Sequence, residues 1–138
     1  MNGCLFCGIV KKSVAAEIVY EDQDAVAFLD IHPRVPGHTM VVPKVHAETI
    51  LELPDSAFQG VFVAVKRVTA LLQKTLRPRG FTIGINHGKV SGQVIDHLHI
   101  HILPRFDNDQ GSSLHSVVNN PPQESIEVMA DKIRNSKY

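Results

Sequence analysis

The sequence has no excess of charge of either sign, because 14 lysines and arginines balance 14 aspartates and glutamates among its 138 residues. A protein that holds a nucleic-acid backbone needs a positive surface that displaces counterions from the phosphates. The balanced composition offers no such surface. A long nucleic acid is therefore not an expected partner.

Long hydrophobic runs are also missing. The apolar stretch at 5–10 is short, is interrupted by Cys7 and Gly8, and has no basic residue before it. It is neither a signal peptide nor a membrane-spanning helix, so we expect a cytoplasmic protein with no membrane partner. There is no internal repeat, and the 43% hydrophobic content suits one domain over 1–138, with its core at about 4–106 and a C-terminal segment at 107–138.

Apolar periodicity predicts five strands and one long helix. Alternating or continuous apolar residues, bounded by turn residues, indicate the strands at 17–21, 25–29, 39–43, 81–86 and 98–103. Short helices are expected at the two ends of the chain, the last one carrying Ile126, Met129 and Ile133. Because the strands do not alternate regularly with helices, the fold class is α+β with a mainly antiparallel five-stranded sheet.

The long helix is expected over 56–76, where apolar residues recur at three- and four-residue steps. Ser56 and Gln59 have the spacing of a capping box at its start. Val63 and Leu71 lie off the main apolar stripe, so the helix is apolar on more than one side. Such a helix is either deeply buried or in contact with another subunit.

Three histidines alternate with apolar residues at 97–102. On a strand, His97, His99 and His101 share one face, while the intervening leucine and isoleucines share the other. The residues alone leave three interpretations: an exposed histidine row, a catalytic zinc held by His99, His101 and His38, or a nucleophilic histidine. We favour the nucleophile, because no nearby carboxylate completes a metal site and an oriented neutral imidazole is reactive near pH 7.

Cys4 and Cys7 have the two-residue spacing of zinc ligands. In a cytoplasmic chain such a pair binds a metal or acts in redox chemistry more often than it forms a structural disulfide. Thioredoxin-like chemistry needs a strand before the pair, and only three residues precede Cys4. Two histidines would complete a tetrahedral Cys₂His₂ site, and the alternative is that both cysteines are simply buried small residues.

Several segments together resemble the histidine triad family. The segment 86–103 ends in the pattern His-φ-His-φ-His-φ-φ, in which φ is an apolar residue, and 28–33 and 36–44 match the family's upstream pattern in order and spacing. The resemblance covers roughly residues 4–106. It implies a homodimeric α+β fold that hydrolyses or transfers nucleoside monophosphates through a nucleotidyl-histidine intermediate, without an organic cofactor.

The resemblance also implies roles for single residues. His99 matches the nucleophile, and His101, His97 and His38 match the supporting histidines. Asn86 stands near the α-phosphate, where the nucleoside phosphoramidase branch has asparagine and the branch that cleaves dinucleoside polyphosphates usually has glutamine.

The remaining substrate contacts are expected around the phosphate, the ribose and the base. Backbone amides at Gly92 and Gln93 are expected to cradle phosphate oxygens, and Asp30 is suited to accept hydrogen bonds from ribose hydroxyls. The base is expected in an apolar slot whose residues would otherwise be ordinary core. The slot consists of Leu5, Phe6, Ile9, Phe28 and Ile31.

Some bacterial and archaeal members of that family, and the related galactose-1-phosphate uridylyltransferases, hold zinc with a histidine after the third strand and the first histidine of the triad. Here these are His46 and His97. The resemblance therefore implies a structural zinc on Cys4, Cys7, His46 and His97, so that His97 serves the fold more than the chemistry.

The function expected from the sequence is that of a purine nucleoside phosphoramidase or related nucleotidyl hydrolase. The first alternative is a dinucleoside polyphosphate hydrolase that uses the same residues, and the asparagine at position 86 argues against it. The second is a nucleotide-binding interaction protein, which an intact triad argues against because a pure binder needs no nucleophile.

Overall fold

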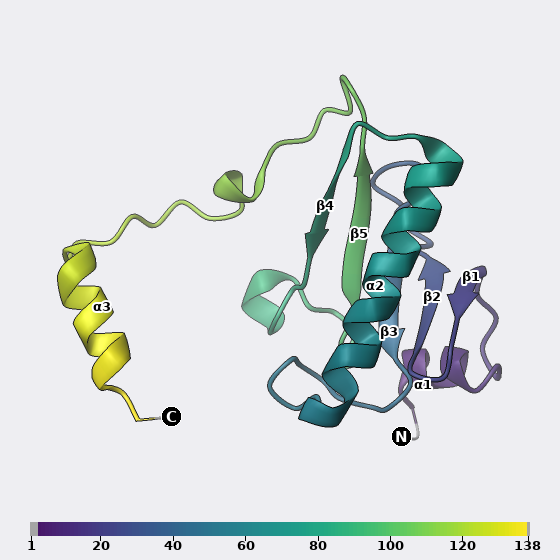
Figure 1. Cartoon of the computed structure of the whole chain (residues 1–138), viewed down its shortest axis with the longest axis horizontal. Helices are drawn as coiled ribbons and strands as arrows, with labels where there is room; N and C mark the ends of the chain where they lie inside the picture. Colours follow the sequence, from purple (N-terminus) through teal and green to yellow (C-terminus); the bar gives the residue numbers. More distant parts are fainter. Residues whose placement is uncertain (1–2, 138) are drawn as a thin grey trace.

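The computed structural model describes residues 3–137. Its sheet is antiparallel throughout, in the order β1-β2-β3-β5-β4 (Figure 1), and the expected α+β class with five strands is confirmed. The elements are α1 (Leu5–Val10), β1 (Ile18–Glu21), β2 (Ala25–Leu29), β3 (Thr39–Pro43), α2 (Asp55–Leu76), β4 (Gly80–Gly84), η1 (Lys89–Ser91), β5 (Ile100–Arg105), η2 (Leu114–Ser116) and α3 (Ile126–Asn135).

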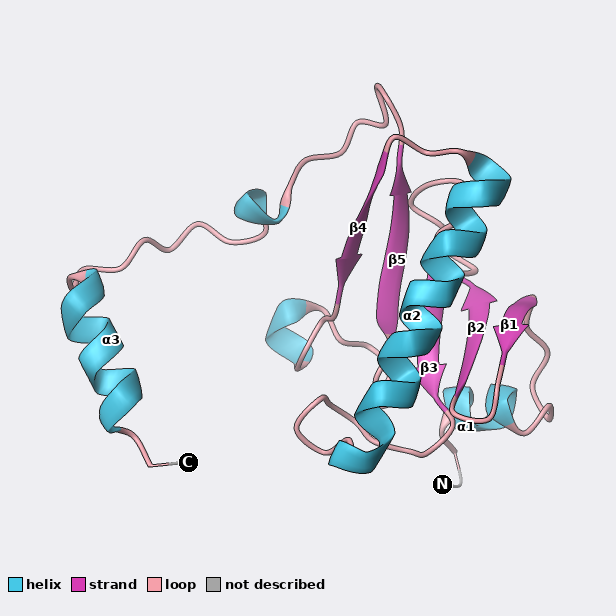
Figure 2. Ribbon diagram, viewed as in Figure 1, coloured by secondary structure: helices cyan, strands magenta, loops and turns pink. Residues whose placement is uncertain are grey.

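The two faces of the sheet are covered by different helices. The long helix α2 lies across one face (Figure 2), where a buried cluster joins Val61, Val65 and Val68 to inward residues of the strands. The short helix α1 packs against the other face through Phe6 and Ile9, next to Phe28 of β2. The central strands β2 and β3 therefore have side chains buried on both sides.

The alternation in β5 decides which face carries the histidines. Leu98, Ile100 and Ile102 are fully buried in the cluster beneath α2. His99 and His101 consequently point to the opposite face, the one that α1 covers in part. The ladder of β5 begins at Ile100 rather than at 98, because the amide of Leu98 donates to the carbonyl of Ala47 instead of to a neighbouring strand.

The expected capping box at the start of α2 is wrong. The N-cap residue is Pro54, and no side chain caps the helix. Ser56 lies inside the first turn, one residue after the helix begins at Asp55, so its hydroxyl cannot take the capping position. The acidic Asp55 in the first turn instead faces the positive end of the helix dipole.

The C-terminal segment leaves the body of the molecule. After η2 the chain runs extended to α3, which stands apart from the sheet and from α2 (Figure 1). Ser125 caps this helix by accepting from the amide of Val128, and Ile126, Met129 and Ile133 are exposed. Within residues 3–137, no helix combines the length and the apolar character needed to cross a membrane.

Candidate active site and metal site

The orientation of His99 is fixed by a hydrogen bond to its own segment. Its Nδ1 atom lies 2.7 Å from the carbonyl oxygen of His97. A carbonyl only accepts, so Nδ1 carries the proton and the Nε2 atom of the neutral ring presents a lone pair. Phe6 packs edge-on against this ring at a centroid distance of 5.2 Å. His99 is therefore a buried, oriented imidazole with a free nucleophilic nitrogen.

A second hydrogen-bond chain fixes the tautomers of His38 and His101. The amide of Arg34 donates to Nδ1 of His38 at 3.2 Å, so the proton of His38 is on Nε2. That nitrogen lies 2.8 Å from Nδ1 of His101 and 3.5 Å from the Oδ2 atom of Asp30. His101 then accepts on Nδ1 and carries its proton on Nε2. The proton donor at the end of this hydrogen-bond chain is Nε2 of His101. The ring centroids of His101 and His99 are 5.0 Å apart.

Burial keeps both histidines of this chain neutral at pH 7. It lowers the pKa of His101 to about 4, with further lowering from the neighbouring His99 and His38. It also lowers the pKa of His38, although the carboxylate of Asp30 opposes the shift. Neutral rings are what the tautomer assignment requires, because a charged ring would donate from both nitrogens.

The residues expected to form the base slot divide into two groups. Phe6, Ile9 and Phe28 are almost fully buried, and the two phenyl rings meet edge to face at 5.2 Å. Leu5 and Ile31 are exposed. The buried group forms the wall behind His99, and the exposed pair supplies the apolar surface available to a base. Their contact with a base remains a prediction.

The loop at 88–94 differs from the expected phosphate cradle. The amide of Gly92 donates to Lys89 at 3.0 Å and that of Gln93 to Gly88 at 3.2 Å, so neither is free for a phosphate. The side chain of Gln93 is buried and bonds Gly88, Glu48 and Ile95, which makes it a brace of the loop. Within the described chain, the exposed Val94 has an amide without a hydrogen-bond partner. That amide is available to a phosphate oxygen.

An open cavity of 470 Å³ adjoins the proton chain. Asp30, His38, Asn86 and His101 line one side of it. Gly84 pairs with His101 across the β4–β5 ladder, and nothing lies within 4 Å of the place where a Cβ on Gly84 would be. The missing side chain keeps the space in front of His101 open. The cavity brings together four of the residues expected at the site.

A second cluster joins the two cysteines to two histidines. Ligand atoms of Cys4, Cys7, His46 and His97 all lie within 4.8 Å of one another. His97 is fully buried, and its Nε2 atom lies 2.9 Å from the carbonyl of Pro43. Nε2 therefore carries the proton, and the lone pair on Nδ1 faces the sulfur atoms of Cys4 and Cys7, each at 3.5 Å.

These distances fit a tetrahedral zinc ion. Zinc–sulfur bonds of about 2.3 Å and zinc–nitrogen bonds of about 2.0–2.1 Å place a sulfur and a nitrogen ligand about 3.6 Å apart. The Sγ atom of Cys7 is 3.3 Å from Nδ1 of His46 and 3.5 Å from Nδ1 of His97. Burial and the neighbouring Cys4 raise the pKa of the Cys7 thiol, a cost that a bound cation would offset.

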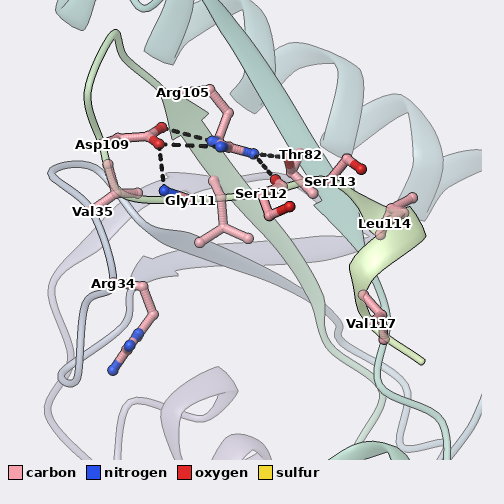
Figure 3. A pocket seen from close by; sticks show the side chains of 11 residues that line it. Arg34, Val35, Thr82, Arg105, Asp109, Gly111, Ser112, Ser113, Leu114 and Val117 are labelled. Carbon is pink, nitrogen blue, oxygen red and sulfur yellow. Dashed lines mark hydrogen bonds and ion pairs between the residues drawn. The ribbon is translucent and has the colours of Figure 1, made fainter. Parts of the chain in front are cut away.

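Arg105 and Asp109 are structural residues of this region that the sequence pattern did not reveal. The guanidinium of Arg105 meets the carboxylate of Asp109 in a paired contact and also donates to Thr82 and to the carbonyl of Ser112 (Figure 3). These bonds hold the chain after β5 against β4. In the sequence, these two residues are recognisable only as an oppositely charged pair four residues apart. Such pairs are common on protein surfaces and do not by themselves indicate a structural role.

The HIT domain model matches residues 11–108, which is most of the chain. The chain belongs to the histidine triad, or HIT, family. A HIT-like protein of Methanocaldococcus jannaschii is 44% identical, over 77% of this chain and 81% of its own. An adenosine 5′-monophosphoramidase of Schizosaccharomyces pombe is 36% identical over 78% of each chain. An adenylylsulfatase of Arabidopsis thaliana is 34% identical over 78% of this chain and 55% of its own.

Solved HIT structures have the same fold. A HIT family protein of Bacillus anthracis superposes with a TM-score of 0.86 at 32% identity, over 99% of both chains, so the C-terminal segment is included. A zinc-bound histidine triad family protein of Mycobacterium smegmatis gives a TM-score of 0.74 at 34% identity, over 80% of both chains. The resemblance stated from the sequence is thereby confirmed.

Proposed function

We propose that this HIT protein hydrolyses the phosphorus–nitrogen bond of purine nucleoside 5′-phosphoramidates through a covalent intermediate on His99. The observation that carries the proposal is the lone pair on Nε2 of His99, which the bond from Nδ1 to the His97 carbonyl leaves free. The relatives named as a monophosphoramidase and an adenylylsulfatase support a nucleotide hydrolase at the level of the family.

In the first half-reaction, Nε2 of His99 attacks the α-phosphorus. A bond forms between phosphorus and the imidazole nitrogen, and the bond between phosphorus and the leaving amine breaks. The amine needs a proton, and Nε2 of His101 holds one. His38, 2.8 Å away, replaces that proton on Nδ1 of His101. A proton from solvent, passed on by the carboxylate of Asp30 at 3.5 Å, restores Nε2 of His38, so that neither ring is left as an imidazolate.

In the second half-reaction, water attacks the same phosphorus and the bond to His99 breaks. The water supplies the new oxygen of the nucleoside monophosphate, and its proton passes through His101, His38 and Asp30 back to solvent. Two moderate barriers then replace one high barrier, which is the general advantage of a covalent route. We assign the contacts with the phosphate oxygens in both steps to the amide of Val94 and the side chain of Asn86.

The test of this function offers the protein adenosine 5′-phosphoramidate, adenylyl-lysine and diadenosine polyphosphates and measures AMP release. We expect AMP from the phosphoramidates with wild type, a loss of at least about 10³-fold with His99→Asn, and full activity with the exposed-histidine control His115→Asn. Equal activity of His99→Asn and wild type would refute the nucleophile. Faster cleavage of the polyphosphates would assign the protein to the alternative hydrolase class.

We further propose that Cys4, Cys7, His46 and His97 hold a structural zinc ion. The tetrahedral spacing of the four ligand atoms supports the site, as does the zinc-bound relative from M. smegmatis. The ion would fix α1 to the end of β3 and to the start of the triad. The residues would hold it without an open position for substrate, so its contribution is to the fold.

A homodimer is the assembly we propose. The strand β4 is an edge of the sheet. Of the two apolar residues that lie off the main stripe of α2, Leu71 is exposed and Val63 is half-buried, and Phe62 is exposed as well, which favours a subunit contact over deep burial of the helix. The helix α3 also exposes an apolar face far from its own body (Figure 1). A second copy of the chain would cover these surfaces together.

A further inference from the structure

Arg34 is the one cation of the catalytic cavity that has a free guanidinium group within the described residues. Its side chain lines the 470 Å³ cavity together with His38 and His101, and it is exposed. No hydrogen bond or ion pair joins its guanidinium to any side chain in residues 3–137. Its backbone amide, in contrast, is committed to His38.

Asp30 lines the same cavity as Arg34 but forms no ion pair with it. The carboxylate of Asp30 accepts from the amide of His32 at 2.8 Å through one oxygen and faces His38 at 3.5 Å through the other. Asp109 is occupied by Arg105, and Figure 3 shows the side chain of Arg34 directed away from that pair. The cavity wall thus carries an arginine that forms no ion pair within the described chain, beside a carboxylate that is hydrogen-bonded to the amide of His32 and faces His38.

The charge of Arg34 reaches the catalytic groups. It lowers the pKa of His38, behind the larger effect of burial, which places the guanidinium within electrostatic range of the proton chain. The cavity continues from His101 past Leu103 to Leu114 and Val117. The cavity therefore combines a guanidinium that has no ion-pair partner with an apolar floor, and Asp30 lies in the same wall.

We propose that Arg34 selects substrates whose leaving group carries a negative charge. This inference rests on the proposed function and names the substrate class: nucleoside 5′-phosphoramidates whose amine bears a carboxylate, sulfonate or phosphonate. A guanidinium binds all three anions through its planar set of donors. A leaving group with a second ammonium is disfavoured by the same charge.

The experiment uses a set of adenosine 5′-phosphoramidates that share one phosphorus–nitrogen bond and an ethylene linker. The amines are propylamine, ethylenediamine, β-alanine, taurine and 2-aminoethylphosphonate, so that the charge of the tail varies and the three anions are compared. For wild type we expect kcat/KM to be about tenfold higher for the anionic tails than for propylamine, which corresponds to about 1.4 kcal/mol. Ethylenediamine should be the poorest substrate.

The variant Arg34→Gln should bring the ratio of anionic to neutral kcat/KM close to one, whatever its absolute activity. Arg34→Lys should keep part of the preference, and Arg79→Gln, an exposed arginine outside the cavity, should keep all of it. The preference of wild type should also weaken as salt rises from 0.05 to about 0.5 M, because screening shortens the reach of the charge.

Two results separate the two proposals. A wild-type protein that cleaves none of the phosphoramidates refutes the proposed function itself. Cleavage with an unchanged ratio in Arg34→Gln refutes only the role of Arg34. A preference for only one of the three anions would narrow the substrate class to that anion and would still support Arg34 as the residue that selects it.

Discussion

The Nδ1 atom of His99 donates to the carbonyl oxygen of His97, only two residues earlier in the chain, at 2.7 Å. The side chain of that same His97 faces the two cysteines, and its Nε2 atom donates to Pro43. The backbone of His97 therefore sets the tautomer of His99, the proposed nucleophile, while its side chain belongs to the cluster of cysteines and histidines proposed to hold zinc. A change that displaces His97 should therefore disturb both the orientation of His99 and the cluster of cysteines and histidines.

The metal cluster gives the first prediction. His46→Ala should remove one zinc per chain and cost about 3 kcal/mol or more, roughly 10 °C in Tm for a domain of this size. Elemental analysis and thermal unfolding measure the two effects, with His115→Ala as the exposed-histidine control. Chelation of wild type followed by zinc addition should lower and then restore Tm. A purified wild type that lacks zinc and gains no stability from it would contradict the site.

The coupling through His97 gives a second prediction. Chelated wild type should lose activity as well as stability, because the carbonyl that orients His99 shifts when the side chain of His97 loses its partner. The loss should appear in kcat more than in KM, since the nucleophile and not the binding surface is disturbed. Steady-state kinetics with and without zinc provide the measurement. Unchanged kcat in zinc-free, folded protein would show that the two sites are independent.

The proton chain predicts a dependence on the leaving group. His101→Phe should lower kcat/KM by about 10²- to 10⁴-fold for an alkylamine leaving group, which needs a proton as it departs. The loss should be much smaller for a p-nitrophenyl ester of the same nucleotide, whose leaving group departs without protonation. His38→Leu should show the same pattern in weaker form. Equal losses for both leaving groups would indicate a structural defect instead.

The lowered pKa values predict how stability depends on pH. Burial lowers the pKa of His101 to about 4 and also lowers that of His38, so the unfolded chain binds more protons than the folded chain between about pH 6.5 and pH 4. The free energy of unfolding must then fall as the pH falls through this window. Urea denaturation at several pH values measures the slope, which His101→Gln should reduce and the exposed-residue control His115→Gln should not. An unchanged slope in His101→Gln would contradict the assignment.

The proposed dimer predicts an effect of single charges on α3. Ile133→Asp places a charge on the exposed apolar face of the helix and should shift the protein toward monomer in light scattering after gel filtration. Asn135→Asp adds the same charge on the opposite side of α3 and should leave the assembly unchanged. A wild-type protein that is monomeric at all concentrations would refute the dimer.

The sequence predicted the sheet and the histidine face because both depend on local periodicity. The strands at 25–29 and 39–43 coincide with β2 and β3, and the buried isoleucines of β5 force His99 and His101 to the other face. Cysteine spacing is a strong local signal that singled out Cys4 and Cys7, and the family resemblance added His46 and His97, which the structure places beside them. The direction of α3 was not foreseeable, since nothing in its amphipathic pattern says which body it packs against.

Features that depend on contacts between distant segments escaped prediction. The amides of Gly92 and Gln93 are consumed by the turn around η1, which spacing alone does not reveal. The tautomer of His38 depends on an amide of the β2–β3 loop, and the free charge of Arg34 depends on Asp30 being engaged elsewhere. Such features follow from how loops close on one another rather than from any residue pattern.

The stereochemical course at phosphorus tests the central claim most directly. An adenosine 5′-phosphoramidate made chiral with sulfur at the α-phosphorus is hydrolysed in ¹⁸O-water, and the configuration of the product is determined. Attack by His99 followed by attack of water inverts phosphorus twice, so we predict net retention. Net inversion would mean that water displaces the amine directly and would contradict the covalent role of His99.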